Sequence, residues 1–127
     1  MKRIILACII LLNTLVLPAT SFAIDMPEKA AMVIRFDRTV PVTYERSLQK
    51  VVQASKQLKP ETFFDIISVV PQTGNTSADA ATTNWATENA AKITQQIMSY
   101  GISQDRIRVA YQPDKSTALN EVHIFVR

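Results

Sequence analysis

The chain is predicted to fold as an α/β two-layer sandwich, with helices packed on one face of a sheet. Three short segments alternate between apolar and polar residues, a fourth is almost wholly apolar, and two longer segments carry apolar residues at helical spacing. Their order along the chain is strand, helix, strand, helix, strand, strand. Each strand–helix–strand crossover is expected to be right-handed.

The first 23 residues are predicted to be a secretory signal peptide. Lys2 and Arg3 form a basic head, residues 4–17 are almost wholly apolar, and small residues precede the cleavage site expected after Ala23. The apolar run is shorter than the ~20 residues of a spanning helix. We therefore expect a single domain at residues 24–127 with no membrane span. An uncleaved membrane anchor is the alternative, and Cys8 lies too early in the run for a lipoprotein signal.

The composition of residues 24–127 argues against several classes of function. Cys8 is the one cysteine of the chain, so the predicted domain can form no disulfide and has no thiolate for a metal or a nucleophile. Loss of Lys2 and Arg3 lowers the formal net charge from +3 to +1. A charge this small gives no electrostatic basis for nucleic-acid binding. We expect no metal and no cofactor.

The first half of the predicted domain supplies two strands and a helix. Residues 31–36 alternate as a strand buried mainly on one side, after a leader at 24–30. Thr43 is the expected N-cap of a helix whose apolar stripe runs to Leu58. Residues 63–70 are apolar on both faces, which is typical of an interior strand, and Pro71 is expected to end it.

A polar loop and a long helix dominate the second half. Residues 71–81 lack periodicity and contain the turn residues Gly74 and Asn75. Thr82 or Thr83 is the expected N-cap of the helix, and Gly101 its stop. Its inward stripe is predicted to consist of Ala86, Ala90, Ile93, Ile97 and Tyr100, with Trp85 packing at the edge.

Two strands complete the domain. In residues 106–111 the side chains of Ile107, Val109 and Tyr111 are expected to point inward, and residues 112–118 are expected to form a loop. The last strand carries Val122, Ile124 and Val126 on its inward face.

The inventory of reactive side chains predicts a protein that is not an enzyme. His123 is the only histidine, and the G-x-S-x-G motif of a nucleophile elbow is absent. With no other His or Cys in residues 24–127, a metal site is not expected. Two glycines are too few for a phosphate-binding loop. Asp65, Asp79 and Glu88 show no convergent spacing for glycoside cleavage.

The predicted outer face of the sheet is charged and mildly basic. Its members are Arg35, Arg106, Arg108, His123 and Arg127, with Asp65 and Glu121 among them. A solvated face is one interpretation, and a docking surface for an acidic partner is the other.

In element order and in several short motifs, the chain resembles the OmpA-like peptidoglycan-associating domain of Gram-negative envelopes. The resemblance covers residues 32–127. It rests on a strand ending Phe36-Asp37, on a turn-rich loop feeding a helix that ends Tyr-Gly-Ile at 100–102, and on Asn120-Glu121-Val122-His123-Ile124 before the last strand. The resemblance implies β-α-β-α-β-β order with the helices on one face of a mixed sheet. It also implies binding of the peptidoglycan stem through an Asp in the loop and an Arg on the helix, which hold the two charged ends of diaminopimelate.

Carried over to this sequence, that motif lacks both charged anchors. Thr73 matches its threonine, but Gly74 stands where the Asp is expected and Asn89 where the Arg is expected. Thr82 replaces the motif's asparagine, and no other Asp is expected near Thr73. The residues left to form a degenerate site are Thr73, Gly74, Asn75, Thr82 and Asn89. The loss of two charge-assisted hydrogen bonds, at ~1.5–3 kcal/mol each, would weaken binding about a hundredfold or more.

The sequence therefore predicts a non-enzymatic periplasmic subunit that docks other envelope proteins, such as an accessory component of a trans-envelope secretion or conjugation system. Its expected location is the periplasm, with association to the outer membrane or cell wall. The alternative is a peptidoglycan-binding protein that uses neutral hydrogen bonds and contacts peptidoglycan weakly. A small periplasmic enzyme or enzyme inhibitor is a third hypothesis, with His123 as its one catalytic candidate.

Overall fold

The structure is a computed structural model that describes residues 29–127. The predicted signal peptide and its cleavage site lie outside the described residues. The elements are β1 (Met32–Phe36), α3 (Glu45–Leu58), β2 (Phe64–Pro71), α4 (Thr76–Ser99), a short 3-10 helix η2 (Gln104–Arg106), β3 (Ile107–Asp114) and β4 (Asn120–Val126). The predicted order of strands and helices is confirmed.

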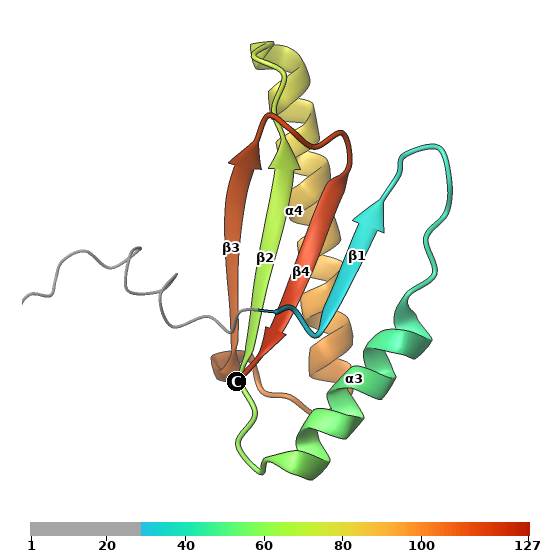
Figure 1. Ribbon diagram of the computed structural model, residues 1–127, viewed down its shortest axis with the longest axis vertical. Helices are drawn as coiled ribbons and strands as arrows, with labels where there is room; N and C mark the ends of the chain where they lie inside the picture. The colour runs from blue at the N-terminus through green and yellow to red at the C-terminus, as the bar shows by residue number, and fades with distance from the viewer. Residues whose placement is uncertain (1–28) are drawn as a thin grey trace, which may run out of the picture.

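The four strands form one mixed sheet in the order β1-β4-β2-β3. β2 and β3 are parallel, whereas β4 runs antiparallel to both β1 and β2. α4 runs behind the sheet in Figure 1, and α3 lies beside the lower end of β1. Because both helices pack on the same face of the sheet, the predicted α/β two-layer sandwich is confirmed.

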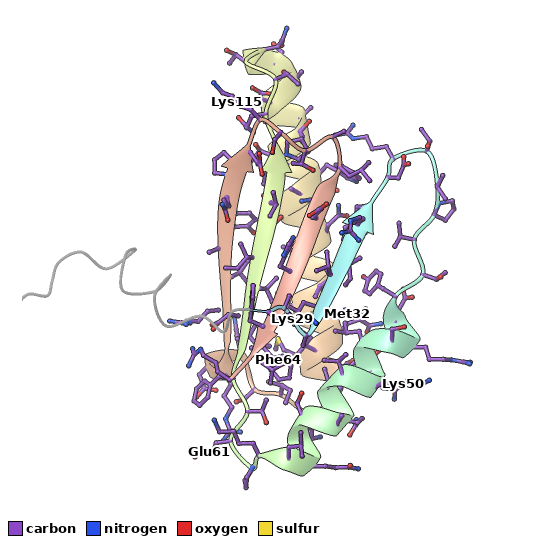
Figure 2. All side chains as sticks on the ribbon, in the orientation of Figure 1. Lys29, Met32, Lys50, Glu61, Phe64 and Lys115 are labelled. Carbon is purple, nitrogen blue, oxygen red and sulfur yellow. The ribbon has the colours of Figure 1, made fainter. Side chains whose placement is uncertain are left out.

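The core lies between this sheet face and the two helices. Its fully buried members are Leu48 and Val52 of α3, Phe64 and Ile66 of β2, Ile93 and Ile97 of α4, and Val122 and Ile124 of β4. Charged side chains such as Lys50, Glu61 and Lys115 project from the periphery (Figure 2). Among the described residues, the core and the side chains packed against it all lie within residues 32–126.

The start of α3 differs from the prediction. Its N-cap is Tyr44, with no side-chain cap hydrogen bond, so Thr43 does not cap the helix. The Glu45 carboxylate folds back to accept the Tyr44 N–H at 3.1 Å and satisfies one of the free donors of the first turn. Leu58 was expected in the buried stripe but is 87% exposed, because the last turn of α3 extends past the core.

α4 begins at Thr76, almost two turns before the predicted caps Thr82 and Thr83. The Asn75 side chain is the N-cap and accepts the Ala78 N–H at 2.9 Å. Several alanines, which have high helix propensity, follow Asn75 and favour a helix there. The prediction missed this first turn because the stretch is polar and has no apolar periodicity. The predicted stop is confirmed, because Gly101 follows the helix at φ +101°.

β3 is longer and more exposed than predicted. It runs on through Gln112 and Pro113 to Asp114, into residues that were expected to form a loop. Val109 and Tyr111 were expected to point into the core, yet they are 39% and 46% exposed. β3 is an edge strand that the helices leave largely uncovered, which also explains why it accommodates Pro113.

Candidate functional site

The loop before α4 brings three of the five predicted site residues together. Thr73 donates from its N–H and its hydroxyl to Asp79 Oδ1, at 2.8 and 2.9 Å, and Gly74 donates its N–H to Asp79 Oδ2 at 3.0 Å. The Thr73 hydroxyl oxygen also accepts the Asn75 N–H at 3.1 Å. Gly74 supplies the tight turn with φ +89°. We call Thr73, Gly74, Asn75 and Asp79 the α4 entry loop.

Asp79 is the member of this loop that the sequence prediction missed. The expectation that no Asp lies near Thr73 is wrong, because the first turn of α4 folds its Asp79 back onto the loop. Asp79 lies four residues after the N-cap Asn75. Had the prediction started the helix at Asn75 and not at Thr82 or Thr83, it would have placed Asp79 in the first turn, next to the loop. The Thr73 N–H lowers the pKa of Asp79, burial opposes this, and the Thr73 hydroxyl and Gly74 N–H lower it further. The ionised carboxylate is therefore used to hold the loop.

Asn89 lies apart from the entry loop, in the protein interior. It is 5% exposed, and its Nδ2 donates to Asn120 Oδ1 at 3.1 Å. Asn120 Nδ2 in turn donates to Ser68 Oγ at 3.0 Å and to the Val69 carbonyl at 2.9 Å. We call Asn89, Asn120 and Ser68 the buried polar cluster. Helical spacing could have revealed this placement, since Asn89 lies three residues after buried Ala86 and four before buried Ile93.

Thr82 lies on α4 between these two clusters and is half-buried. The predicted set therefore divides into three residues in the entry loop, one on the flank of α4 and one in the interior.

A cleft of about 460 Å³ separates α4 from the segment between β1 and α3. The Arg38 guanidinium lies 4.7 Å from the centre of the Trp85 ring and donates to the Ala81 carbonyl at 3.3 Å. Such stacking of a cation on an aromatic face is favourable. Asn89 forms part of the floor, and the other lining residues are Phe36, Asp37, Thr39, Val40, Pro41, Val42, Tyr44, Glu45 and Lys92. We call this feature the Arg38–Trp85 cleft.

Charges of both signs line the Arg38–Trp85 cleft. Asp37 and Glu45 supply carboxylates, and Arg38 and Lys92 supply cations. Hydrogen bonds from the Thr39 backbone and hydroxyl lower the pKa of Asp37, so this carboxyl is ionised at neutral pH. The cleft can thus bind a group that carries both charges, or a charged protein surface. No hydrogen bond or ion pair within residues 29–127 joins Arg38 to Asp79.

The face of the sheet opposite the helices pairs its charges internally. Asp65 is fully buried and accepts from Arg108 Nε at 2.7 Å and from the Arg127 guanidinium. Burial raises the pKa of Asp65, but the hydrogen bonds and charges of Arg108 and Arg127 outweigh it, so the pKa lies below its ordinary value. Glu121 pairs with Arg35 at 3.1 Å and with His123 Nε2 at 3.0 Å.

These pairs reduce the basic character expected of this face. Arg106 lies in η2, before β3 begins, and its guanidinium lies 6.0 Å from the centre of the Phe63 ring and donates to the Pro60 carbonyl. The hydrogen bond from His123 lowers the pKa of Glu121, burial opposes this, and Arg35 lowers it further. His123 thus has an ionised carboxylate neighbour on the sheet surface.

Within the described residues no group of three or more His, Cys, Asp or Glu side chains could hold a metal ion. No helix of residues 29–127 is long and apolar enough to cross a membrane.

No protein-family model matches the sequence, and no curated protein matches it. The fold is similar to that of a solved structure, the C-terminal domain of Helicobacter pylori MotB (residues 125–256), with a TM-score of 0.52 and 11% sequence identity over 76% of this chain and 84% of that chain. The periplasmic domain of the same protein (residues 97–256) aligns with a TM-score of 0.46 and 9% identity over 80% and 81% of the two chains. The first likeness shows that the chain has the OmpA-like fold.

Proposed function

We propose that this chain is a non-enzymatic periplasmic docking subunit of a cell-envelope assembly, such as an accessory component of a trans-envelope secretion or conjugation system. The OmpA-like fold supports an envelope role, and the signal peptide expected at residues 1–23 supports a periplasmic or cell-wall location. The proposed partners are other envelope proteins.

The observation that carries this proposal is how the carboxylate of the α4 entry loop is used. Asp79 already accepts three hydrogen bonds from its own loop, two from Thr73 and one from Gly74, so its carboxylate serves to hold the loop. The Arg38–Trp85 cleft instead presents an arginine and a tryptophan. Both residue types are enriched at protein interfaces. We therefore place the docking surface on this cleft.

A second candidate function is peptidoglycan binding through a non-standard site. The mixed charges of the Arg38–Trp85 cleft favour it, because Arg38 and Lys92 can meet the carboxylate of a zwitterionic stem residue while Asp37 or Glu45 meets its ammonium group. Neutral hydrogen bonds from Thr73, Asn75 and Thr82 would add to these contacts, whereas Asn89 could add little because it is buried.

Sedimentation with purified sacculi separates the two functions. If the chain is a docking subunit, a protein made of residues 24–127 should stay in the supernatant. A photo-cross-linking residue in place of Arg38 or Trp85 should capture envelope proteins in intact cells. Saturable binding to the sacculi would instead establish the peptidoglycan function, provided that the affinity falls about tenfold or more in Arg38→Ala but not in Arg46→Ala. Arg46 is the matched control because it is an exposed arginine on α3, outside the cleft.

A further inference from the structure

One buried polar atom at the floor of the Arg38–Trp85 cleft has no hydrogen-bond partner within residues 29–127. Asn89 is 5% exposed, and its Nδ2 donates to Asn120 Oδ1, but no donor of the described chain reaches its own Oδ1. Buried polar groups in folded proteins are nearly always hydrogen-bonded. Asn89 Oδ1 is therefore available to a donor that is not part of the fold.

The direction of this oxygen is set by the buried polar cluster. The Val69 carbonyl can only accept, so Asn120 must turn its Nδ2 toward Val69. Asn120 Oδ1 then faces Asn89, which must donate to it with Nδ2. Asn89 lines the cleft and Asn120 does not, so the Oδ1 branch of Asn89 is the one left on the cleft side.

The Tyr44 hydroxyl is a second polar group of the same kind. Tyr44 is 9% exposed and lines the cleft, and its hydroxyl forms no hydrogen bond in the described part of the chain. Burial raises the pKa of Tyr44, and electrostatic interactions with Glu45 and Tyr100 raise it further, so the hydroxyl keeps its proton. The cleft thus offers one acceptor, Asn89 Oδ1, and one donor, the Tyr44 hydroxyl. Together they match the N–H and C=O groups of a polypeptide backbone.

The cleft continues along α4. A neighbouring hollow of about 290 Å³ is lined by Tyr44, Glu45, Lys92, Gln95 and Gln96. The first three of these residues also line the cleft, so the two hollows adjoin. Trp85, Asn89, Lys92 and Gln96 recur at helical spacing, which places them on one face of α4. From Trp85 to Gln96 this face is about 16 Å long, the length of about five extended residues. We call the cleft and this hollow the α4 groove.

The cations of the α4 groove are the charges left for a ligand. Its carboxylates, Asp37 and Glu45, both accept backbone N–H groups of their own segment. Among the described residues, Lys92 forms no hydrogen bond or ion pair, and the one hydrogen bond of the Arg38 side chain goes to a backbone carbonyl. A negatively charged ligand is therefore favoured.

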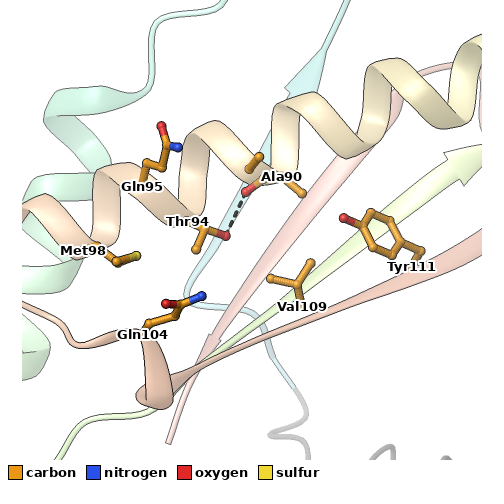
Figure 3. Close-up of a pocket in the computed structure, with 8 residues that line it drawn as sticks. Ala90, Thr94, Gln95, Met98, Gln104, Val109 and Tyr111 are labelled. Atoms are coloured by element: carbon orange, nitrogen blue, oxygen red, sulfur yellow. Dashed lines mark hydrogen bonds between the residues drawn. The ribbon is translucent and has the colours of Figure 1, made fainter.

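The hollow on the β3 side of α4 offers no such group in the part of the chain that the structure describes. This hollow measures about 350 Å³ and lies between α4 and β3 (Figure 3). Its half-buried Thr94 donates its hydroxyl to the Ala90 carbonyl at 2.9 Å. Its other polar side chains, Gln95, Gln104 and Tyr111, are exposed to water. Buried groups without a partner thus distinguish the α4 groove from this hollow.

We propose that the α4 groove binds an extended, acidic segment of a partner protein. A backbone N–H of the segment donates to Asn89 Oδ1, and a carboxylate of the segment pairs with Lys92. These two residues lie one turn apart on the same face of α4, about 5 Å along its axis, so one short stretch of the segment reaches both. Asn89 is too buried for a bulky group to reach it, but a backbone N–H is small enough to reach the floor. The inference rests on the proposed docking function and names the chemistry of the partner.

Nuclear magnetic resonance titration of the purified protein with a blocked pentapeptide of alternating valine and glutamate tests the proposal. We expect saturable shifts of the Asn89 side-chain amide and of the Lys92 backbone resonances, with a dissociation constant below ~1 mM. A pentapeptide with lysine in place of glutamate should bind at least about tenfold more weakly, because its charge is reversed. N-methylation of the backbone of the glutamate peptide removes its donors and should weaken binding about tenfold.

Substitution of Lys92 tests the charged contact. Lys92 is exposed, so Lys92→Gln should fold normally, which circular dichroism verifies, and it should weaken binding of the glutamate peptide about fivefold. Lys92→Arg keeps the charge and should bind as the wild type does. Lys50→Gln is the matched control, since Lys50 is an exposed lysine on α3 outside the α4 groove. It should leave the dissociation constant unchanged.

Three results would overturn the inference. They are an absence of shifts at up to ~5 mM glutamate peptide, equal binding of the glutamate and lysine peptides, and binding that neither Lys92→Gln nor N-methylation weakens. The photo-cross-links at Arg38 and Trp85 judge the docking function separately. Capture of envelope proteins without peptide binding would refute the acidic segment alone. Sacculus binding that depends on Arg38 would refute the docking function and this inference with it.

Discussion

Two polar clusters include residues of α4, and similar polar side chains have a different role in each. The α4 entry loop is exposed, and its hydrogen bonds shape one turn of backbone around Asp79. The buried polar cluster of Asn89, Asn120 and Ser68 lies between α4 and the sheet, where water cannot replace a lost partner. Hydrogen bonds in the interior are costly to break because the remaining group stays unsatisfied. Burial, more than residue type, therefore decides which cluster the fold depends on.

The largest effect is expected from Asn120→Ala. The fully buried Asn120 side chain accepts from Asn89 and donates to Ser68 and to the Val69 carbonyl. Its removal leaves buried partners unsatisfied and opens a cavity, so the free energy of unfolding should fall by about 3 kcal/mol. Urea denaturation followed by circular dichroism measures this loss. A change below ~1 kcal/mol would mean that the cluster is not structural and would remove the contrast with the entry loop.

An intermediate effect is expected from Asp65→Asn, which sharpens the contrast between a buried and an exposed carboxylate. The substitution removes the negative charge that accepts the hydrogen bonds of Arg108 and Arg127, but these arginines are 42% and 33% exposed and can be solvated. We therefore expect a loss of about 2 kcal/mol at neutral pH.

The pH dependence of that loss has a definite sign. The pKa of Asp65 in the folded state lies below the ordinary value of 3.8, so the ion pairs stabilise the fold at all pH values above the unfolded pKa. This stability is lost as pH falls through the folded pKa. The difference in unfolding free energy between wild type and Asp65→Asn should consequently narrow below about pH 4. A difference that stays constant down to about pH 2 would contradict the assigned ion pairs.

Most of the fold could be predicted because its signals are local and periodic. The alternation of Ile34 and Phe36, the apolar run of β2, and Gly101 after α4 each determine an element without reference to the rest of the chain. The predictions were wrong where the position of a strand in the sheet decides which side chains are buried. Val109 and Tyr111 alternate like core residues, but their strand lies at the edge of the sheet. Strand order is a long-range property that periodicity does not encode.

The candidate site was less predictable than the fold. Thr73, Gly74 and Asn75 were placed together by their turn chemistry, whereas the role of Asn89 depended on which face of α4 it occupies. Arg38 reaches Trp85 from a segment more than forty residues away, and no sequence pattern links the two. The cleft is therefore a product of the fold, and only the structure could show it.

The smallest effect is expected in the entry loop, from Asn75→Ala. The Asn75 side chain accepts the Ala78 N–H, and an alanine leaves that donor of the first turn without a protein partner. Water can reach this exposed site, so the free energy of unfolding should fall by only about 1 kcal/mol. Asn84→Ala is the matched control, because Asn84 lies exposed within α4. Alanine has the higher helix propensity, so this control should stabilise the protein by about 0.5 kcal/mol. Opposite signs for the same substitution on one helix, measured by urea denaturation, would establish Asn75 as the cap. If both substitutions changed the free energy of unfolding in the same direction, α4 would start elsewhere and Asn75 would not be its N-cap.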